Sequence, residues 1–241
     1  MSTGSSQTAQ SIGHILFCGD THGCFEHVID AVVKQRPAAI VFLGDIQPQR
    51  PLHDELKEIV KLAEIWWIHG NHDTDSDADY DNLFGSALAD RNLHGRVEEI
   101  AGIRVAGLGG IFRRQIWAPP EPILYDTPSD FAARCGKGNL WRGGLPRKHR
   151  SSIFPSDYAQ LADEHADILV THEAPSCHPH GFFQIDELAR RLGVRAAFHG
   201  HHHDRLDYHR YSDGLGFHAY GVGLCGITDE RGFMVRPGDS D

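Results

Sequence analysis

Residues 14–25 read HILFCGDTHGCF, and this stretch sets the pattern for the fold. The apolar run Ile12–Cys18 predicts a buried strand, which ends at a glycine followed by an aspartate. The same pattern returns at residues 38–43 and 65–68, each followed by polar residues. Segments with apolar side chains at helical spacing alternate with these strands, at residues 25–33 and 52–62. This alternation predicts βαβ units and a parallel sheet with both faces covered.

The second half of the chain predicts a more varied set of elements. A hairpin is expected over residues 97–108, with its turn at Ala101 and Gly102. The next elements are a helix at 158–162 that Ser156 would cap, and strands at 167–170 and 196–198 with a helix at 185–192 between them. The tail predicts antiparallel strands, at residues 206–211, 216–220 and 221–227.

Length and charge limit the class of protein. The 241 residues and the 40% hydrophobic content fit a single domain, expected over residues 12–241 after a flexible tail at residues 1–11. The formal net charge of −10 makes long nucleic acid an unfavourable partner. The tail lacks the apolar core of a signal peptide, and no apolar run approaches the ~20 residues that span a bilayer, so no membrane partner is expected. The oligomeric state stays open.

The balance of histidine and cysteine points to imidazole chemistry. The chain has 18 histidines but only five cysteines, which are odd in number and scattered. Their spacing argues against a disulfide framework and against a zinc ribbon. Free thiols fit a cytoplasmic protein.

Five short polar motifs follow the predicted strands. They are Gly19–His22, Gly44–Asp45, Gly70–Asp73, Thr171–His172 and Gly200–His203. Ligands of open α/β sheets bind at the carboxyl ends of strands, and alternate residues of an extended segment point to the same side. Oxygen and imidazole donors without thiolates suit Mn²⁺, Fe²⁺, Zn²⁺ or Ni²⁺ rather than a structural zinc. Taken singly, each aspartate or asparagine could equally serve a turn or a helix cap.

These motifs, in this order, resemble the calcineurin-like metallophosphoesterase superfamily, which also includes the purple acid phosphatases. The resemblance covers residues from about 14 to 226, and residues 92–110 are most similar to the smaller bacterial-type members. It implies a four-layer α-β-β-α sandwich with two mixed sheets. It also implies a binuclear metal site at the carboxyl ends of the strands.

The resemblance also implies a role for each matching residue. Asp20, His22 and His203 would bind one metal ion, Asn71, His172 and His201 would bind the other, and Asp45 would bridge both. His72 would be catalytic rather than a ligand. Two divalent ions, with manganese favoured, would then hold a bridging hydroxide that attacks a small or nucleotide-like phosphomonoester or phosphodiester, assisted by His72.

One departure from the pattern concerns the segment after Asp45. The Ser/Thr protein phosphatases place a second aspartate there as the partner of the catalytic histidine, followed by an arginine that binds phosphate. Here Ile46 to Gln49 contain no carboxylate, and Arg50 falls one position late. Protein phosphatase activity is therefore not expected, and Arg50 remains only a candidate for substrate binding.

A basic insertion (residues 111–155) is expected to be irregular, because it is rich in proline, glycine and arginine. Arg113 and Arg114 lie near its start and are further candidates for substrate binding. No acidic residue occurs between Phe131 and Ser156, where six basic residues do. The insertion could be a lid that presents guanidinium groups to phosphate, or a solvated basic loop. Its tryptophans, Trp117 and Trp141, could stack on a base or anchor the loop.

The remaining histidines and Asp73 have alternative interpretations. His69 is expected in the core, and His202 should point away from the two ligands that flank it. His199 and Asp73 could each orient a ligand. His178 and His180 could contact substrate, although a solvated loop is the simpler expectation.

Two other function classes compete with the phosphoesterase. One is a non-catalytic metal-binding scaffold for protein contacts, against which His72 argues because a scaffold has no need of it. The other is a different binuclear hydrolase, of the metallo-β-lactamase or amidohydrolase type. Such enzymes would need an early His-x-His, whereas the first one here is His178–His180.

Overall fold

The computed structural model describes residues 14–240, so the predicted tail at residues 1–11 and the first residues of the predicted strand 12–18 lie outside it. The strands are β1 (Ile15–Cys18), β2 (Ala39–Leu43), β3 (Glu64–Ile68), β4 (Arg96–Ile100), β5 (Ile103–Leu108), β6 (Ile168–Thr171), β7 (Ala196–His199), β8 (His218–Gly221), β9 (Ile227–Asp229) and β10 (Met234–Arg236). The α-helices are α1 (Glu26–Gln35), α2 (Leu52–Glu55), α3 (Asp77–Phe84), α4 (Pro128–Arg134), α5 (Pro155–Ala162), α6 (Phe183–Leu192) and α7 (Ser212–Leu215). Short 3₁₀ turns are η1 (His72–Thr74), η2 (Ala89–Arg91), η3 (Lys137–Asn139), η4 (Arg147–Ser151) and η5 (His209–Tyr211).

The strands form two five-stranded mixed sheets. The first has the order β10-β9-β1-β2-β3 and the second the order β4-β5-β6-β7-β8. Strands β1, β2 and β3 are parallel, as the sequence predicted, and β9 joins β1 antiparallel. In the second sheet β5 to β8 are parallel, and β4 forms the predicted hairpin with β5. Both mixed sheets of the predicted architecture are therefore present.

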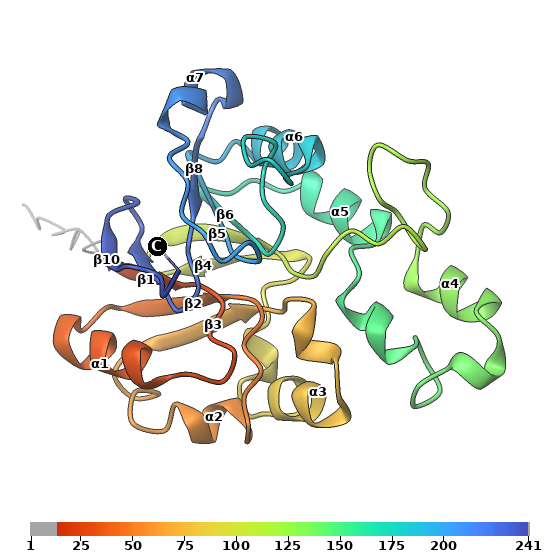
Figure 1. Ribbon diagram of the computed structural model, residues 1–241, viewed down its shortest axis with the longest axis horizontal. Helices are drawn as coiled ribbons and strands as arrows, with labels where there is room; N and C mark the ends of the chain where they lie inside the picture. Colours follow the sequence, from red (N-terminus) through yellow and green to blue (C-terminus); the bar gives the residue numbers. More distant parts are fainter. Residues whose placement is uncertain (1–13, 241) are drawn as a thin grey trace, which may run out of the picture.

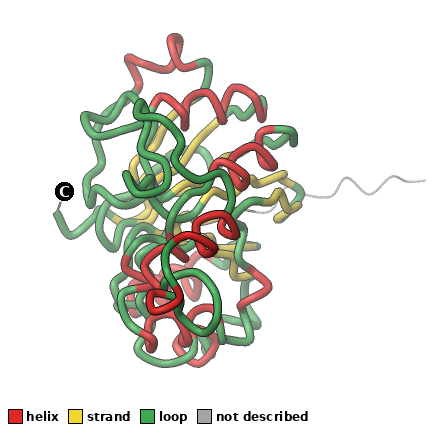
Figure 2. The backbone as a smooth tube through the Cα atoms, turned by 90° about the vertical axis from the view of Figure 1, so that its right-hand side faces the viewer, coloured by secondary structure: helices red, strands yellow, loops and turns green. Residues whose placement is uncertain are grey.

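Side-chain alternation along the strands creates the layers. In β1 and β2, Leu16 and Phe42 pack with α1 and α2, whereas Phe17 and Val41 face the second sheet. Phe17 stacks on Phe198 of β7 with ring centroids 4.0 Å apart. The far face of the second sheet packs against α5 and α6. The result is the expected α-β-β-α order, with α1 to α3 on one side of the sheets and α5 and α6 on the other (Figure 1). Figure 2 shows the strands running between these helices.

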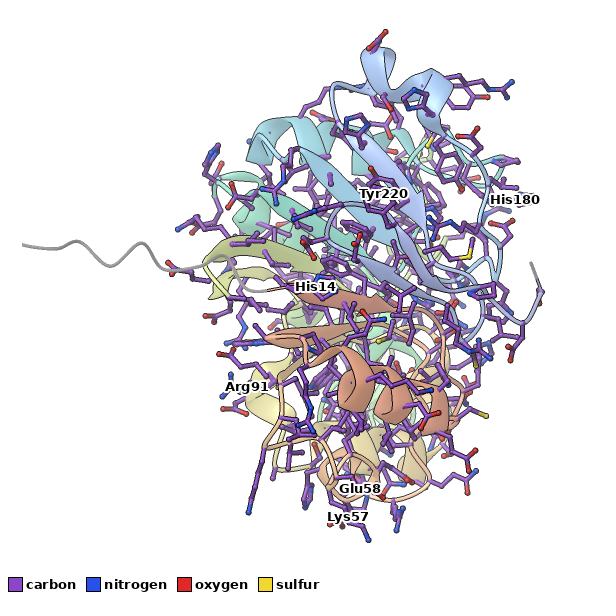
Figure 3. All side chains as sticks on the ribbon, turned by 90° about the vertical axis from the view of Figure 1, so that its left-hand side faces the viewer. His14, Lys57, Glu58, Arg91, His180 and Tyr220 are labelled. Atoms are coloured by element: carbon purple, nitrogen blue, oxygen red, sulfur yellow. The ribbon has the colours of Figure 1, made fainter. Side chains whose placement is uncertain are left out.

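The predicted helix over residues 52–62 is much shorter than expected. Only Leu52–Glu55 is α-helical, and a run of consecutive turns follows it, in which the amide of Ile59 donates to the carbonyl of Leu56. The buried face survives, because Leu56 and Ile59 are fully buried. Val60, in the same segment, is exposed. Lys57 and Glu58 from this segment lie at the lower end of the molecule in Figure 3.

The predicted antiparallel tail is wrong in three places. Residues 206–211 form a loop and η5 rather than a strand, and β8 pairs with β7 in parallel. The connection from His199 to His218, which contains α7, is long enough for the crossover that a parallel pair requires. Residues 222–226 form a loop rather than the predicted strand 221–227, and the antiparallel hairpin of β9 and β10 lies beyond it, where no strand was predicted after residue 227. The predicted cap of α5 is also wrong, since Phe154 holds the N-cap position and Pro155 begins the helix.

The basic insertion is largely irregular, as predicted, and it packs on an acidic segment of the same chain. Arg142 binds Asp81 at 2.5 Å, and Arg147 forms an ion pair with Asp77. Trp141 packs edge-on against Tyr80 with ring centroids 4.8 Å apart. These guanidinium groups are therefore engaged within the chain. Trp117 is buried against Phe112 and Tyr158, and both tryptophans anchor the insertion.

His149 makes the packing of the insertion sensitive to acid. Burial, together with the positive charges of Arg113 and Lys148, lowers its pKa from 6.5 to about 4. Between these pH values the unfolded chain binds a proton that the folded chain does not, so stability should fall as the pH drops through this window. His149→Gln should reduce by about 2 kcal/mol the loss of unfolding free energy between pH 7 and pH 4.5. Urea unfolding with a chelator present measures this difference, and equal losses in both proteins would contradict it.

None of the helices in residues 14–240 is both long and apolar enough to cross a membrane. The five cysteines are unpaired, with Cys18 and Cys225 buried.

Candidate metal centre

The predicted ligands converge from both sheets at the carboxyl ends of their strands. The first sheet contributes Asp20 after β1, Asp45 after β2 and Asn71 after β3. The second sheet contributes His172 after β6 and the histidines that follow β7. Sequence separates these residues by up to about 180 positions, but the packing of the two sheets brings all of them to one place.

Two groups of donor atoms meet at Asp45. One comprises His22, Asp45 and His203, the other comprises Asp45, His172 and His201, and within each group the donor atoms lie within 4.8 Å of one another. Asn71 joins the second group, since its Oδ1 is 3.2 Å from Nε2 of His172. Asp20 lies beside the first group, because its Oδ2 is 3.7 Å from Nε2 of His203, and its Oδ1 is 3.7 Å from Nδ1 of His172. All seven predicted ligands are thus brought together.

Neighbouring groups fix the orientation of two of the imidazoles. Nδ1 of His172 donates to the carbonyl oxygen of Leu43 at 2.8 Å, and Nδ1 of His22 donates to Oε1 of Gln47 at 2.6 Å. Each bond leaves Nε2 facing the other donors. This is the usual arrangement for a metal-binding histidine, whose second nitrogen is held by a hydrogen bond.

The backbone at these positions is unusual. His22, Asp45, His201 and His203 all adopt positive φ values, from 43° to 73°, which residues with a Cβ rarely do. Such conformations cost about 1–3 kcal/mol each and concentrate at functional sites. The glycines before the ligands allow close approach. Gly44 has a φ of 100°, and a Cβ on Gly70 would collide with the carboxylate of Asp45.

The donor atoms fit divalent cations. With Nδ1 of His172 donating to a carbonyl, Nε2 faces two oxygens, at 3.2 Å from Asn71 and 3.3 Å from Asp45, so a proton or a cation must lie among these acceptors. Ring nitrogens of His22 and His203 face each other at 3.1 Å. Oδ1 of Asp20 is buried and has no hydrogen-bond donor. Bound cations would give each of these facing or unpaired acceptor atoms a favourable partner.

The charges of the site support the same interpretation. Burial raises the pKa of Asp20 well above its usual range, partly offset by His172. The pKa of Asp45 is depressed, because the charge and hydrogen bond of His172 outweigh burial. Burial and the charge of His172 lower the pKa of His201 to about 4. The charges of Asp45 and Asp20 in turn outweigh burial and raise the pKa of His172 to about 10. Metal binding requires ionised carboxylates and neutral imidazoles, so bound cations would replace the protons that Asp20 and His172 hold in their absence.

Asp73 connects two loops of the site through hydrogen bonds. Its Oδ1 accepts from the backbone amides of Ile46 and Gln47, and its Oδ2 accepts from the amide of Gly70, all at 2.8 Å. The side chain is fully buried. Asp73 is therefore more than a turn residue, since it joins the loop after β2 to the loop after β3.

Replacing Asp73 with alanine should lower the free energy of unfolding by about 3 kcal/mol, because two buried amides and one partly buried amide would lose their acceptor. Asp73→Asn keeps one acceptor oxygen and should cost less. Urea unfolding of the chelator-treated protein measures both, with Asp90→Ala, at an exposed position, as the control. A loss below about 1 kcal/mol in Asp73→Ala would count against this role.

His72 lies at the open edge of the site, with 46% of its side chain exposed. Its backbone amide donates to Oδ1 of Asp45 at 2.8 Å, and its Nδ1 donates to Oδ2 of Asp75 at 2.5 Å. Burial lowers the pKa of His72, but the hydrogen bond of Asp75 and the charges of Asp45 and Asp75 outweigh it and raise the pKa. Bound cations would act in the opposite direction.

The three arginine candidates have different surroundings. Arg113 is half-buried, binds Oγ of Ser151 at 3.2 Å and leaves its buried Nε without a hydrogen-bond partner. Burial lowers its pKa, while the charges of Asp75, Glu173 and Asp45 act against this, so it faces the acidic side of the site. The guanidinium groups of Arg50 and Arg114 are paired with Glu55 and Glu121, at 3.0 and 3.2 Å.

The other histidines lie around the site. His69 is buried in the core, as predicted, and His199 is buried and bonded to the carbonyl of Gly200. His202 turns from the ligands and stacks on His178 with centroids 3.9 Å apart. His178 is buried, with Nε2 3.3 Å from Asp204, rather than part of a solvated loop. His180 is exposed and lies near the right-hand edge of Figure 3, away from the labelled His14 and Tyr220.

The sequence did not single out three residues that contact the site. Gln47 orients His22, Asp75 binds His72, and buried Glu173 accepts from the amide of Phe112 at 2.9 Å, which joins the insertion to the strand end at His172. The signal for Asp75 was its position three residues after His72, which a helical turn brings onto the same face. Gln47 and Glu173 carried no such signal.

Comparison with known proteins identifies the family. A family model described as calcineurin-like phosphoesterase matches residues 13–205. The chain therefore belongs to the calcineurin-like phosphoesterase family, which makes it a phosphoester hydrolase.

The relatives extend the match to most of the chain. An uncharacterized protein of Haemophilus influenzae is 45% identical over 219 residues, which cover 90% of this chain and 94% of that protein. The crystal structure of TT1561 of Thermus thermophilus matches with a TM-score of 0.56 and 16% identity, covering 95% of this chain and 99% of that one. At this identity the second comparison supports the fold alone.

Proposed function

We propose that this protein hydrolyses a small phosphoester at a binuclear metal centre. The observation that carries the proposal is the carboxylate of Asp45, which belongs to both donor groups while it also accepts the backbone amide of His72. A shared carboxylate suits two ions held close together, which is the arrangement of binuclear hydrolases. The net charge of −10 supports a small substrate rather than long nucleic acid.

Each ligand has a place in this proposal. Asp20, His22 and His203 hold one ion, Asn71, His172 and His201 hold the other, and Asp45 contacts both. The mixed oxygen and imidazole donors suit Mn²⁺ best, with Fe²⁺, Zn²⁺ and Ni²⁺ as alternatives. When bound, the ions polarise the phosphoryl oxygens and lower the pKa of water to near neutrality.

The side chains at the open edge act on the substrate. Nδ1 of His72 is held by Asp75, so Nε2 is free to donate a proton to the leaving oxygen. Arg113 is half-buried and faces the acidic side of the site, where its guanidinium group can bind a phosphoryl oxygen. Arg50 and Arg114 contribute less, because each is already paired with a glutamate.

An activity panel tests the proposal. The protein, loaded with Mn²⁺ and analysed for bound metal, would be assayed on a nitrophenyl monoester, the corresponding bis-ester, cyclic nucleotides and dinucleoside polyphosphates. The proposal expects metal-dependent hydrolysis of at least one of them, abolished by a chelator and restored by Mn²⁺. Bound metal with no hydrolysis of any ester would favour the scaffold instead.

A further inference from the structure

The turn that follows Asn71 places a carboxylate against the ring of His72. Nδ1 of His72 and Oδ2 of Asp75 are 2.5 Å apart, across the single turn η1. Within residues 14–240, Asp75 is the one hydrogen-bond partner of this ring. Residues 46–49, in the loop after β2, contain no carboxylate, and Gln47 in that loop binds His22. Asp75 is thus the acid that orients the ring.

The pair is too exposed to be rigid by itself. The side chains of His72 and Asp75 are 46% and 56% exposed, and exposed ion pairs contribute little because water competes and side-chain entropy opposes them. A fixed geometry therefore requires that the backbone of the turn be held by something else.

The basic insertion holds this backbone. Nε of Arg147 donates to the carbonyl of Thr74 at 3.1 Å, and its Nη2 donates to the carbonyl of Asp75 at 2.7 Å. Oγ of Ser151 is 2.8 Å from Oγ1 of Thr74 on the same turn. The remaining nitrogen of Arg147 pairs with Asp77, so its side chain is itself fixed, with 32% exposed. Turn η4 of the insertion thus braces turn η1.

We propose that Asp75 is the positioning residue of His72 and that Arg147 of the basic insertion fixes both. This inference rests on the proposed hydrolysis. Asp75 accepts the Nδ1 proton, which leaves the second proton of the imidazolium on Nε2. In the reaction an oxygen atom from water bonds to phosphorus as the bond between phosphorus and the leaving oxygen breaks, and the Nε2–H bond breaks as an O–H bond forms on that leaving oxygen. The neutral imidazole then takes a proton from water.

Four variants and two esters test this assignment. The variants are Asp75→Ala, Asp75→Asn, Arg147→Met and the control Arg134→Met, an exposed arginine of the same insertion. The esters are a nitrophenyl ester, whose leaving oxygen needs little protonation, and the corresponding phenyl ester, whose leaving oxygen is more basic. Asp75→Ala should lower kcat about 10²-fold on the phenyl ester and less than about 10-fold on the nitrophenyl ester, with KM and bound metal unchanged.

The other variants should lower kcat by smaller amounts or not at all. Asp75→Asn keeps an acceptor without its charge and should fall between Asp75→Ala and the wild type. Arg147→Met should lower kcat about 10-fold on the phenyl ester with the same preference between esters, and Arg134→Met should match the wild type. An equal loss on both esters, no loss, or loss of bound metal in Asp75→Ala would overturn the proposal.

A measurement without substrate separates this inference from the proposed function. Proton–nitrogen NMR of the Zn²⁺-loaded protein, with the His72 signals assigned from His72→Gln, reports which ring nitrogen carries the proton. At a pH where the ring is neutral, the wild type should hold it on Nδ1, and Asp75→Ala should move it to Nε2. The same tautomer in both proteins would overturn the assignment. If the wild type hydrolysed no ester, the proposed function would fail while this measurement would still decide the contact.

Discussion

Asp45→Asn should lower kcat/KM by about 10³-fold and reduce bound metal from two ions to at most one per chain. Asparagine has almost the same shape, so it fits against Gly70 and keeps the packing of the strand ends. It removes the negative charge that both donor groups share and leaves one oxygen where two are needed. The stabilisation of transition-state charge by the ions is worth several kcal/mol, and each 1.36 kcal/mol corresponds to a factor of ten.

Metal analysis beside kinetics checks this prediction. Asp90→Asn, at an exposed position, is the control for the loss of one negative charge. Circular dichroism would establish that both variants are folded. An Asp45→Asn protein that kept two ions and half of the wild-type kcat/KM would rule out the shared carboxylate as the centre of the site.

His72→Ala should retain both ions and lose most of the turnover. General acid catalysis by a histidine contributes about 10²–10⁴-fold, so kcat should fall within this range. The ring is half exposed and contacts no predicted ligand through a hydrogen bond of its side chain, so the unfolding free energy should change by less than about 0.5 kcal/mol. Loss of turnover at full metal content would distinguish His72 from the ligands.

The matched control is His180→Ala, which removes an exposed imidazole from a loop after β6. Its activity and metal content should equal those of the wild type. If His72→Ala kept the wild-type turnover, His72 would not be the general acid of the proposed reaction, and the site would have no assigned general acid.

Much of the fold followed from local patterns. The apolar runs ending at Cys18, Leu43 and Ile68 predicted three parallel strands, because a strand buried on both faces must be apolar at every position. The prediction of an antiparallel tail was wrong, because β8 pairs with β7 in parallel. Whether β8 pairs parallel or antiparallel depends on the path of the preceding connection, and its residues do not encode that path.

The basic insertion shows why side-chain charge alone does not predict what an arginine contacts. Its arginines predicted either a lid over phosphate or a solvated loop. In both interpretations the guanidinium groups contact substrate or solvent rather than other residues of the chain. In the structure, Arg142 and Arg147 bind carboxylates of the segment 77–81, about 65 residues earlier. Ion pairs between distant segments depend on which surfaces the fold brings together, and no local pattern records that.

The sequence by itself determined which donor groups lie at the strand ends of this protein. The motifs that follow the strands together supply seven oxygen and nitrogen donors and no thiolates. Polar residues can follow a buried strand at the point where the chain leaves the sheet, and this is where open α/β sheets bind ligands. Only the tertiary structure decided how these donors meet. Packing of the two sheets set Asp45 between both groups, held His22, His201 and His203 at positive φ, and brought Arg147 onto the turn that carries His72 and Asp75. Donor type is a property of each residue, whereas distance and orientation arise from the packing of the whole chain.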